Sequence, residues 1–220
     1  HPNWNGEINR DALTLFMRHN YIPAPWSIYK NILKLLPAHF VVISDNGQTI
    51  SSPQCYWDLG KIASEGVESA TGSPEECIEE LDSLLRKSVL SRMASDVPLG
   101  AFLSGGFDSS MVVAMMQSQA TQPVKTFTIG FHEQGHNEAH HAKEIARHLG
   151  TDHTELYVTP DEAMAVIPRL PTIWDEPFSD SSQIPTLLVS ELARSQVTVS
   201  LSGDGGDELF CGYTRYTLGY

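Results

Sequence analysis

Short apolar segments alternate with helical patterns from about residue 73 to residue 201, and this alternation is what most constrains the fold. The apolar segments cover residues 99–103, 126–131, 156–158 and 197–201. Strands that alternate with helices predict right-handed crossovers and a parallel sheet covered on both faces. We therefore expect an α/β fold built on a parallel sheet flanked by helices.

Two sequence signatures mark where helices of this region begin. Ser73-Pro74-Glu75-Glu76 and Thr159-Pro160-Asp161-Glu162 each place a hydroxyl three residues before a glutamate, with Pro at the first helical position. A further helix should run from Ala139 to Leu149 and end at Gly150.

The N-terminal part of the chain has a different pattern. We expect a short helix capped by Asp11, with Met17 on its apolar face. A hairpin should follow, because residues 40–43 are strand-like and Asp45-Asn46-Gly47 is a turn signal. This helix plus hairpin is too little to fold alone.

We therefore divide the chain near residue 60. Residues 1–60 are interpreted as the remnant of an upstream domain with its linker, and residues 61–220 as the N-terminal part of a second, incomplete domain. A Gly- and Ser-containing stretch at 66–72 separates the two patterns.

The charge balance argues against one class of partner. The chain has 14 Lys+Arg against 27 Asp+Glu, a formal net charge of -13. A duplex nucleic-acid binder normally carries a basic stripe, so we expect no nucleic-acid partner. Because positive charge is scarce, any bound phosphate must be held by backbone N–H groups, helix N-termini or a metal ion.

Cysteine content and hydropathy favour a cytoplasmic protein without a membrane partner. Three scattered cysteines are too few for a disulfide framework, and no CxxC pair suggests zinc. No apolar run approaches the roughly 20 residues of a membrane span.

The most informative segment, Leu103-Ser104-Gly105-Gly106-Phe107-Asp108-Ser109-Ser110, follows the first strand and opens a helix. Ligands of open α/β sheets bind at that edge. The two glycines let a phosphate approach the backbone, whose N–H groups can donate to it. Ser104, Ser109 and Ser110 add hydroxyl donors, and Asp108 offers a carboxylate oxygen to Mg2+. The competing interpretation is a simple turn with an Asp N-cap.

A second glycine loop, Ser200 to Phe210, follows the last strand. It crowds Asp204, Asp207 and Glu208 together, which is costly unless a cation or a proton-transfer role stabilises them. The competing interpretation is that Asp204 and Asp207 are helix N-caps, although one cap would suffice.

These two loops carry a resemblance. SGGFDSS resembles the pyrophosphate loop, SGGxDS, of the ATP pyrophosphatase superfamily, which has an adenine nucleotide alpha hydrolase-like fold. The second loop, continued through Gly212-Tyr213, resembles the motif SG(E/D)GxDE(L/V)FGGY of glutamine-hydrolysing asparagine synthetases. The chain is thus identified as a member of that family. Cys211 stands where the family usually has Gly, so we expect a slightly altered loop.

The resemblance implies roles for individual residues. Asp108 and Asp207 would hold Mg2+, while Asp204 and Tyr213 would be the catalytic residues, with Asp204 linked to proton transfer from ammonia. The implied nucleotide-binding residues are Phe102, Leu103, Ser104, Gly105, Gly106, Asp108, Ser109, Ser110, Ile129, Ser202 and Gly203. Among these, Phe102 and the backbone near Ile129 would lie beside adenine.

The activity implied by the resemblance is ATP- and Mg2+-dependent amide synthesis. The side-chain carboxylate of aspartate would be adenylated with release of pyrophosphate, and ammonia derived from glutamine would then give asparagine. The segment from Asn20 to His39 resembles the end of the family's glutaminase domain, so residues 1–60 would be the C-terminal remnant of a glutaminase-type domain with its linker. The nucleophilic N-terminal Cys of that domain is absent, and the family's remaining catalytic residues lie past Tyr220. We therefore expect weak nucleotide binding and no synthetase activity from these residues alone, and an uncovered sheet face that favours a homodimer.

Two alternatives stay open. The chain could belong to a related amidotransferase that acts on another carboxylate, such as a sugar uronic acid, or it could only bind nucleotide. Separately, His136 and His140 lie one turn apart, but neither a zincin nor a zinc-deaminase motif completes them, so we interpret them as helix surface.

Overall fold

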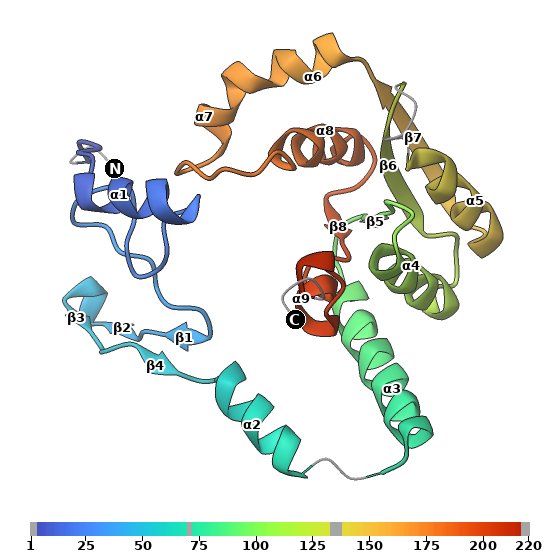
Figure 1. The fold of residues 1–220 in the computed structure, drawn as a ribbon, viewed down its shortest axis with the longest axis horizontal. Coiled ribbons are helices and arrows are strands. Elements are labelled where there is room, and N and C mark those ends of the chain that lie inside the picture. Colours follow the sequence, from blue (N-terminus) through green and yellow to red (C-terminus); the bar gives the residue numbers. More distant parts are fainter. Residues whose placement is uncertain (1–3, 70–71, 133–137, 217–220) are drawn as a thin grey trace. The chain divides into compact units, whose positions relative to one another are not determined.

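The computed structural model describes residues 4–69, 72–132 and 138–216, and the chain divides into two compact units (Figure 1). One unit comprises His1–Gly72 with Pro168–Ser181, and the other comprises Ser73–Ile167 with Ser182–Tyr220. Residues 168–181 thus group with the N-terminal part of the chain. The assignment of residues 1–60 and 61–220 to two domains stays a prediction.

The second unit contains a four-stranded parallel sheet in the order β7-β6-β5-β8. Its strands are β5 (Leu99–Phe102), β6 (Lys125–Phe131), β7 (Asp152–Val158) and β8 (Val199–Leu201). β7 begins four residues before its predicted start, because it pairs with β6 from Asp152 to Val158 and its first half is polar. The expected parallel sheet is confirmed.

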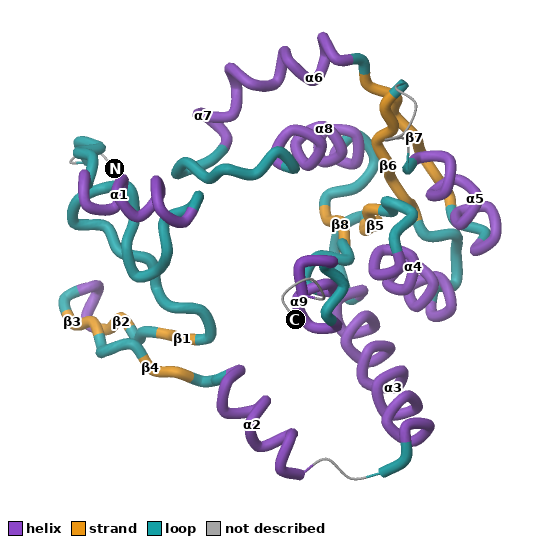
Figure 2. Tube along the Cα trace, in the orientation of Figure 1, coloured by secondary structure: helices purple, strands orange, loops and turns teal. Residues whose placement is uncertain are grey.

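Helices cover both faces of this sheet (Figure 2). The main core joins α3 (Pro74–Met93), α4 (Phe107–Gln119) and α5 (Ala139–Leu149) to Ala101 and Leu103. On the opposite face, α8 (Gln183–Arg194) packs with Phe127 and Phe102. The remaining helices of this unit are α6 (Pro160–Val166) and the short α9 (Gly206–Phe210).

The predicted helix ends of this unit are confirmed. Ser73 and Thr159 each accept a hydrogen bond from the backbone of a glutamate that in turn bonds the N-cap backbone, which completes both capping boxes. Gly150 ends α5 in the left-handed conformation, with φ 71°.

The first unit begins with α1 (Arg10–His19), and here Asp11 is not the cap that we expected. Asn9 caps the helix, because its side-chain oxygen accepts from the backbone N–H groups of Asp11 and Ala12 at 3.1 and 3.3 Å. Asp11 instead lies in the first turn, where a negative charge suits the helix dipole. Met17 is 75% exposed, so the helix buries Ala12 rather than Met17.

The expected hairpin is present, but as two short ladders. β2 (Ile43–Ser44) pairs with β3 (Thr49–Ile50) across Asp45–Gly47, while β1 (His39–Phe40) pairs with β4 (Gln54–Cys55). The short helix α7 (Leu170–Ile173) also belongs to this unit.

The residues around Gly66 are helical. α2 (Leu59–Ser69) contains Gly66, although glycine costs a helix about 1 kcal/mol relative to alanine. Asp58 Oδ1 accepts from Lys61 N at 3.1 Å at its start, and Lys61 pairs with Glu65 one turn later. Within the described residues, no helix combines the length and apolar character needed to cross a membrane.

Candidate functional site

The two glycine loops meet because their strands are neighbours. β5 and β8 run parallel, with Ala101 opposite Leu201, so the residues that follow both strands emerge at the same edge. This is the carboxyl edge of the sheet, where ligands of α/β folds bind. Residues about 100 positions apart in the sequence therefore form one site.

A cavity of about 570 Å3 lies between the loops. Its lining includes most of the candidate residues, namely Phe102, Ser104, Gly106, Asp108, Ser109, Ser202, Gly203, Asp204 and Asp207. None of the described lining residues is Lys or Arg. A phosphate held here would thus depend on backbone N–H groups, hydroxyls and a cation.

The other candidate residues do not line this cavity. Leu103 is 1% exposed and belongs to the core, and the Ser110 hydroxyl donates to Gly106 O at 2.6 Å. Ile129 lies in β6, away from both loops along the sequence. The Tyr213 hydroxyl donates to Glu208 Oε1 at 2.7 Å. Their roles stay predictions.

Gly105 also does not line the cavity, and its nucleotide-binding role stays a prediction. With φ 88°, it adopts a backbone conformation that favours glycine. A Cβ there would lie 3.0 Å from Ala142 N and 3.1 Å from His141 Cβ, so its small size lets the loop pack on α5. Its packing thus accounts for this glycine without a ligand.

Hydroxyl groups hold the first loop in shape. The Ser104 and Ser109 hydroxyls are 2.9 Å apart, and Ser109 Oγ also accepts from Ser104 N at 3.2 Å. Gly106 N donates to Ser104 Oγ at 3.3 Å. These contacts fix the loop before a ligand binds.

The start of α4 is open to an anion. Gly106 is its N-cap, and no side chain caps the helix. The simpler interpretation of Asp108 as an N-cap is therefore wrong. Because uncapped N–H groups and the helix dipole both favour negative charge, this end of α4 suits a phosphate.

Gly203 and Gly206 allow the second loop to touch the first. A Cβ at Gly203 would lie 2.6 Å from Ser109 N, and a Cβ at Gly206 would overlap the Asp108 carboxyl group. Any side chain at these positions would force the loops apart. The close approach brings Asp108 beside the loop that carries Asp204 and Asp207.

The carboxylates of the second loop do not cap a helix. Gly205 is the N-cap of α9, with no side-chain hydrogen bond, so the interpretation of Asp204 and Asp207 as caps is wrong. Ser202 Oγ instead donates to Asp204 Oδ2 at 3.0 Å. Asp108 and Asp207 both reach the cavity and offer the oxygen ligands that Mg2+ prefers, so the donor set fits that ion.

Sequence reasoning missed several lining residues. Thr186 and Val189 come from α8, whereas Phe107 and Phe210 belong to the two loop segments themselves. Phe107 is 94% exposed, which is unusual for a phenylalanine. Its position inside the SGGFDSS motif was the available signal for Phe107, whereas nothing local marked α8.

The chain is similar in sequence to several known proteins. A family model described as asparagine synthase matches residues 80–219. A protein of Methanocaldococcus jannaschii, named as a glutamine-hydrolysing asparagine synthetase, is 41% identical over 214 residues, which are 97% of this chain and 40% of that protein. Asparagine synthetase 1 of Bacillus subtilis is 33% identical over 96% of this chain and 32% of its own length.

A Penicillium rubens protein named as an amidase is also similar, with 29% identity over 86% of this chain and 30% of that protein. The chain thus spans two fifths or less of the length of these relatives.

Proposed function

Because the chain belongs to the asparagine synthase family, we propose that it supplies the nucleotide-binding part of an ATP-dependent amide-forming ligase. The proposed reaction adenylates the side-chain carboxylate of aspartate and then amidates it with ammonia derived from glutamine. The supporting observation is a cavity that both glycine loops line, with three carboxylates and the uncapped start of α4.

The start of α4 and the first loop are proposed to hold the phosphates of ATP. The carboxylate oxygen of aspartate would attack the α-phosphorus, and the bond from that phosphorus to the bridging oxygen would break to release pyrophosphate. The N–H groups at the start of α4 are fixed in place, so they can stabilise negative charge as it develops on the leaving group. Ser104 and Ser109 keep the loop in that geometry.

Asp108 and Asp207 are proposed to hold Mg2+. When bound, the ion would neutralise phosphate charge, which the cavity needs because its described lining has no Lys or Arg. The proximity of Gly206 to Asp108 keeps the first carboxylate against the second loop.

Asp204 is proposed to accept a proton during amidation. Ammonia would attack the acyl carbon, its nitrogen would lose a proton, and AMP would leave with the bond electrons. The Ser202 hydroxyl orients the Asp204 carboxylate by donating to Oδ2, which leaves Oδ1 for the proton. Tyr213 is a second proposed catalytic residue, on family resemblance alone.

Pyrophosphate release by the full-length protein tests the proposal. ATP, Mg2+ and ammonia would be combined with a panel of carboxylates, and we expect release that depends on aspartate. Release with a sugar acid and none with aspartate would favour an amidotransferase for another carboxylate. Nucleotide binding without release on any carboxylate would favour a module that only binds nucleotide.

Carboxylate variants test the metal assignment within this proposal. Asp108→Asn and Asp207→Asn should each weaken Mg-nucleotide binding in calorimetry while the fold is retained. Asp96→Asn is the matched control, because this exposed aspartate precedes β5 and so lies near the opposite end of the strand. Affinities equal to that of the parent in both site variants would defeat the assignment.

A further inference from the structure

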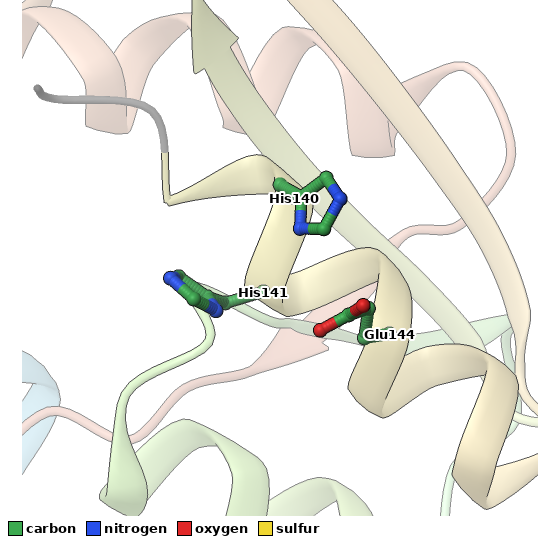
Figure 3. Close-up of side chains that lie close together, drawn as sticks. All are labelled: His140, His141 and Glu144. Carbon is green, nitrogen blue, oxygen red and sulfur yellow. The ribbon is translucent and has the colours of Figure 1, made fainter. Parts of the chain in front are cut away.

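Three side chains that can bind a metal gather near the start of α5 (Figure 3). His140, His141 and Glu144 are all exposed, and one donor atom from each lies within 4.8 Å of the others. The pair singled out from the sequence was His136 with His140. His136 lies outside the described residues, so the structural cluster rests on His140 and two different partners.

The spacing of the three residues explains why Glu144 lies beside each histidine. Residues three and four apart are neighbours on a helix surface. Glu144 follows His140 by four positions and His141 by three, so it lies about one helical turn beyond both histidines. One helix therefore presents two nitrogens and one oxygen without help from a second element.

These ligand groups are not engaged elsewhere. In the part of the chain that the structure describes, no side-chain hydrogen bond or ion pair joins His140, His141 or Glu144 to another residue. The two imidazole rings meet edge to face, with their centroids 6.1 Å apart. The neighbouring cation, Lys143, is paired with Glu155 of β7 at 2.8 Å. The Glu155 carboxylate therefore largely compensates the positive charge of Lys143, which would otherwise repel a cation at the cluster.

The donor chemistry selects a class of ion. Imidazole nitrogen suits Zn2+ and the neighbouring transition metals, whereas Mg2+ and Ca2+ take oxygen ligands. Two histidines and one glutamate form a known ligand set for zinc that leaves a position open to water. The acidic chain, with a net charge of -13, also attracts cations.

We propose that His140, His141 and Glu144 form a binding site for a zinc-like transition-metal ion. The side chains are exposed and can rotate toward a common centre at the distances of about 2.0–2.2 Å that zinc requires. The site is separate from the carboxylate cavity, with which it shares no lining residue. It lies next to the first loop, because a Cβ on Gly105 would be only 3.1 Å from His141 Cβ.

A cobalt titration tests this site directly. Co2+ substitutes for Zn2+ and gives visible absorption when it is held by protein ligands in a tetrahedral site. We expect one Co2+ per chain, displaced by Zn2+ but not by excess Mg2+. His141→Asn and Glu144→Gln should each weaken binding at least about tenfold, since loss of even an outer-shell partner costs 10–100-fold.

His148→Asn is the matched control, because His148 is exposed on the same helix outside the cluster. This variant should bind Co2+ with the affinity of the parent, and circular dichroism should show that every variant is folded. The proposal is overturned by absent binding, by binding equal to the parent in both site variants, or by an equal loss in His148→Asn. A thiolate-to-cobalt charge-transfer band would also overturn it, because the metal would then sit on an exposed cysteine.

Discussion

Gly203 illustrates how a single residue sets the geometry of the candidate site. A Cβ at this position would lie 2.6 Å from Ser109 N and 2.9 Å from the Asp108 carbonyl carbon. Both are backbone atoms at the start of α4, so neither can rotate away as the end of a flexible side chain could. The absence of a side chain at Gly203 therefore keeps the two loops in contact.

Gly203→Ala should separate the loops. We expect a loss of about 1–3 kcal/mol in the free energy of unfolding, as for other overpacked sites, together with weaker Mg-nucleotide binding. Urea denaturation and calorimetry would measure the two effects. Gly66→Ala is the control: nothing lies within 4 Å of its Cβ, so it should stabilise α2 by up to about 1 kcal/mol. Parent-like binding by Gly203→Ala would contradict this account.

At the scale of elements, the pairing of β6 with β7 places polar groups under α5. His153 Nδ1 lies 2.9 Å from Thr126 Oγ1, and Thr126 is fully buried. His153 Nε2 is buried without a hydrogen-bond partner among the described residues. Burial is the main cause that lowers the pKa of His153 below its usual 6.5.

The lowered pKa of His153 predicts that acid weakens the second unit. On acidification the unfolded chain protonates this imidazole first, so stability is lost as pH falls below about 6.5. The urea concentration at the unfolding midpoint should therefore decrease as the pH is lowered from about 7.5 to 5.5. His153→Asn should make this decrease smaller, because it removes the titrating group. Glu155, whose pKa the Lys143 hydrogen bond lowers, titrates below this window. An unchanged pH dependence in His153→Asn would be evidence against this role.

At the scale of the whole molecule, the candidate site and the tryptophans belong to different units. Every described residue that lines the cavity lies in the unit of residues 73–167 and 182–220. All four tryptophans, at positions 4, 26, 57 and 174, lie in the other unit. Tryptophan fluorescence thus reports on one unit, while far-ultraviolet circular dichroism reports on both.

Mg-ATP should stabilise the unit that contains the cavity. A ligand at 100 times its Kd adds about 2.7 kcal/mol to the native state. We expect thermal unfolding followed by circular dichroism to shift upward, with a smaller shift of the tryptophan transition. The shift should be lost in Asp108→Asn. Equal shifts by both probes would show that the units unfold together and would contradict the expected separation.

The sequence by itself determined the elements whose signals are local. The capping boxes at Ser73 and Thr159 formed as expected, because their hydrogen bonds join residues three positions apart. The glycine loop from Ser104 to Ser109 was recognisable because its pattern is also a short continuous stretch of the sequence. Alternating strands and helices then predicted a parallel sheet, and chain handedness leaves few other arrangements.

Tertiary structure alone decided features that depend on distant partners. β7 is polar over its first half and is a strand because β6 pairs with it along its full length. Thr186 and Val189 reach the cavity only because α8 packs on the sheet, and Gly105 is required by the approach of α5. Segment 168–181 joins the N-terminal unit through contacts such as that of Ser179 N with Asn20 O. Such contacts join residues far apart in the chain, so no local pattern could specify them.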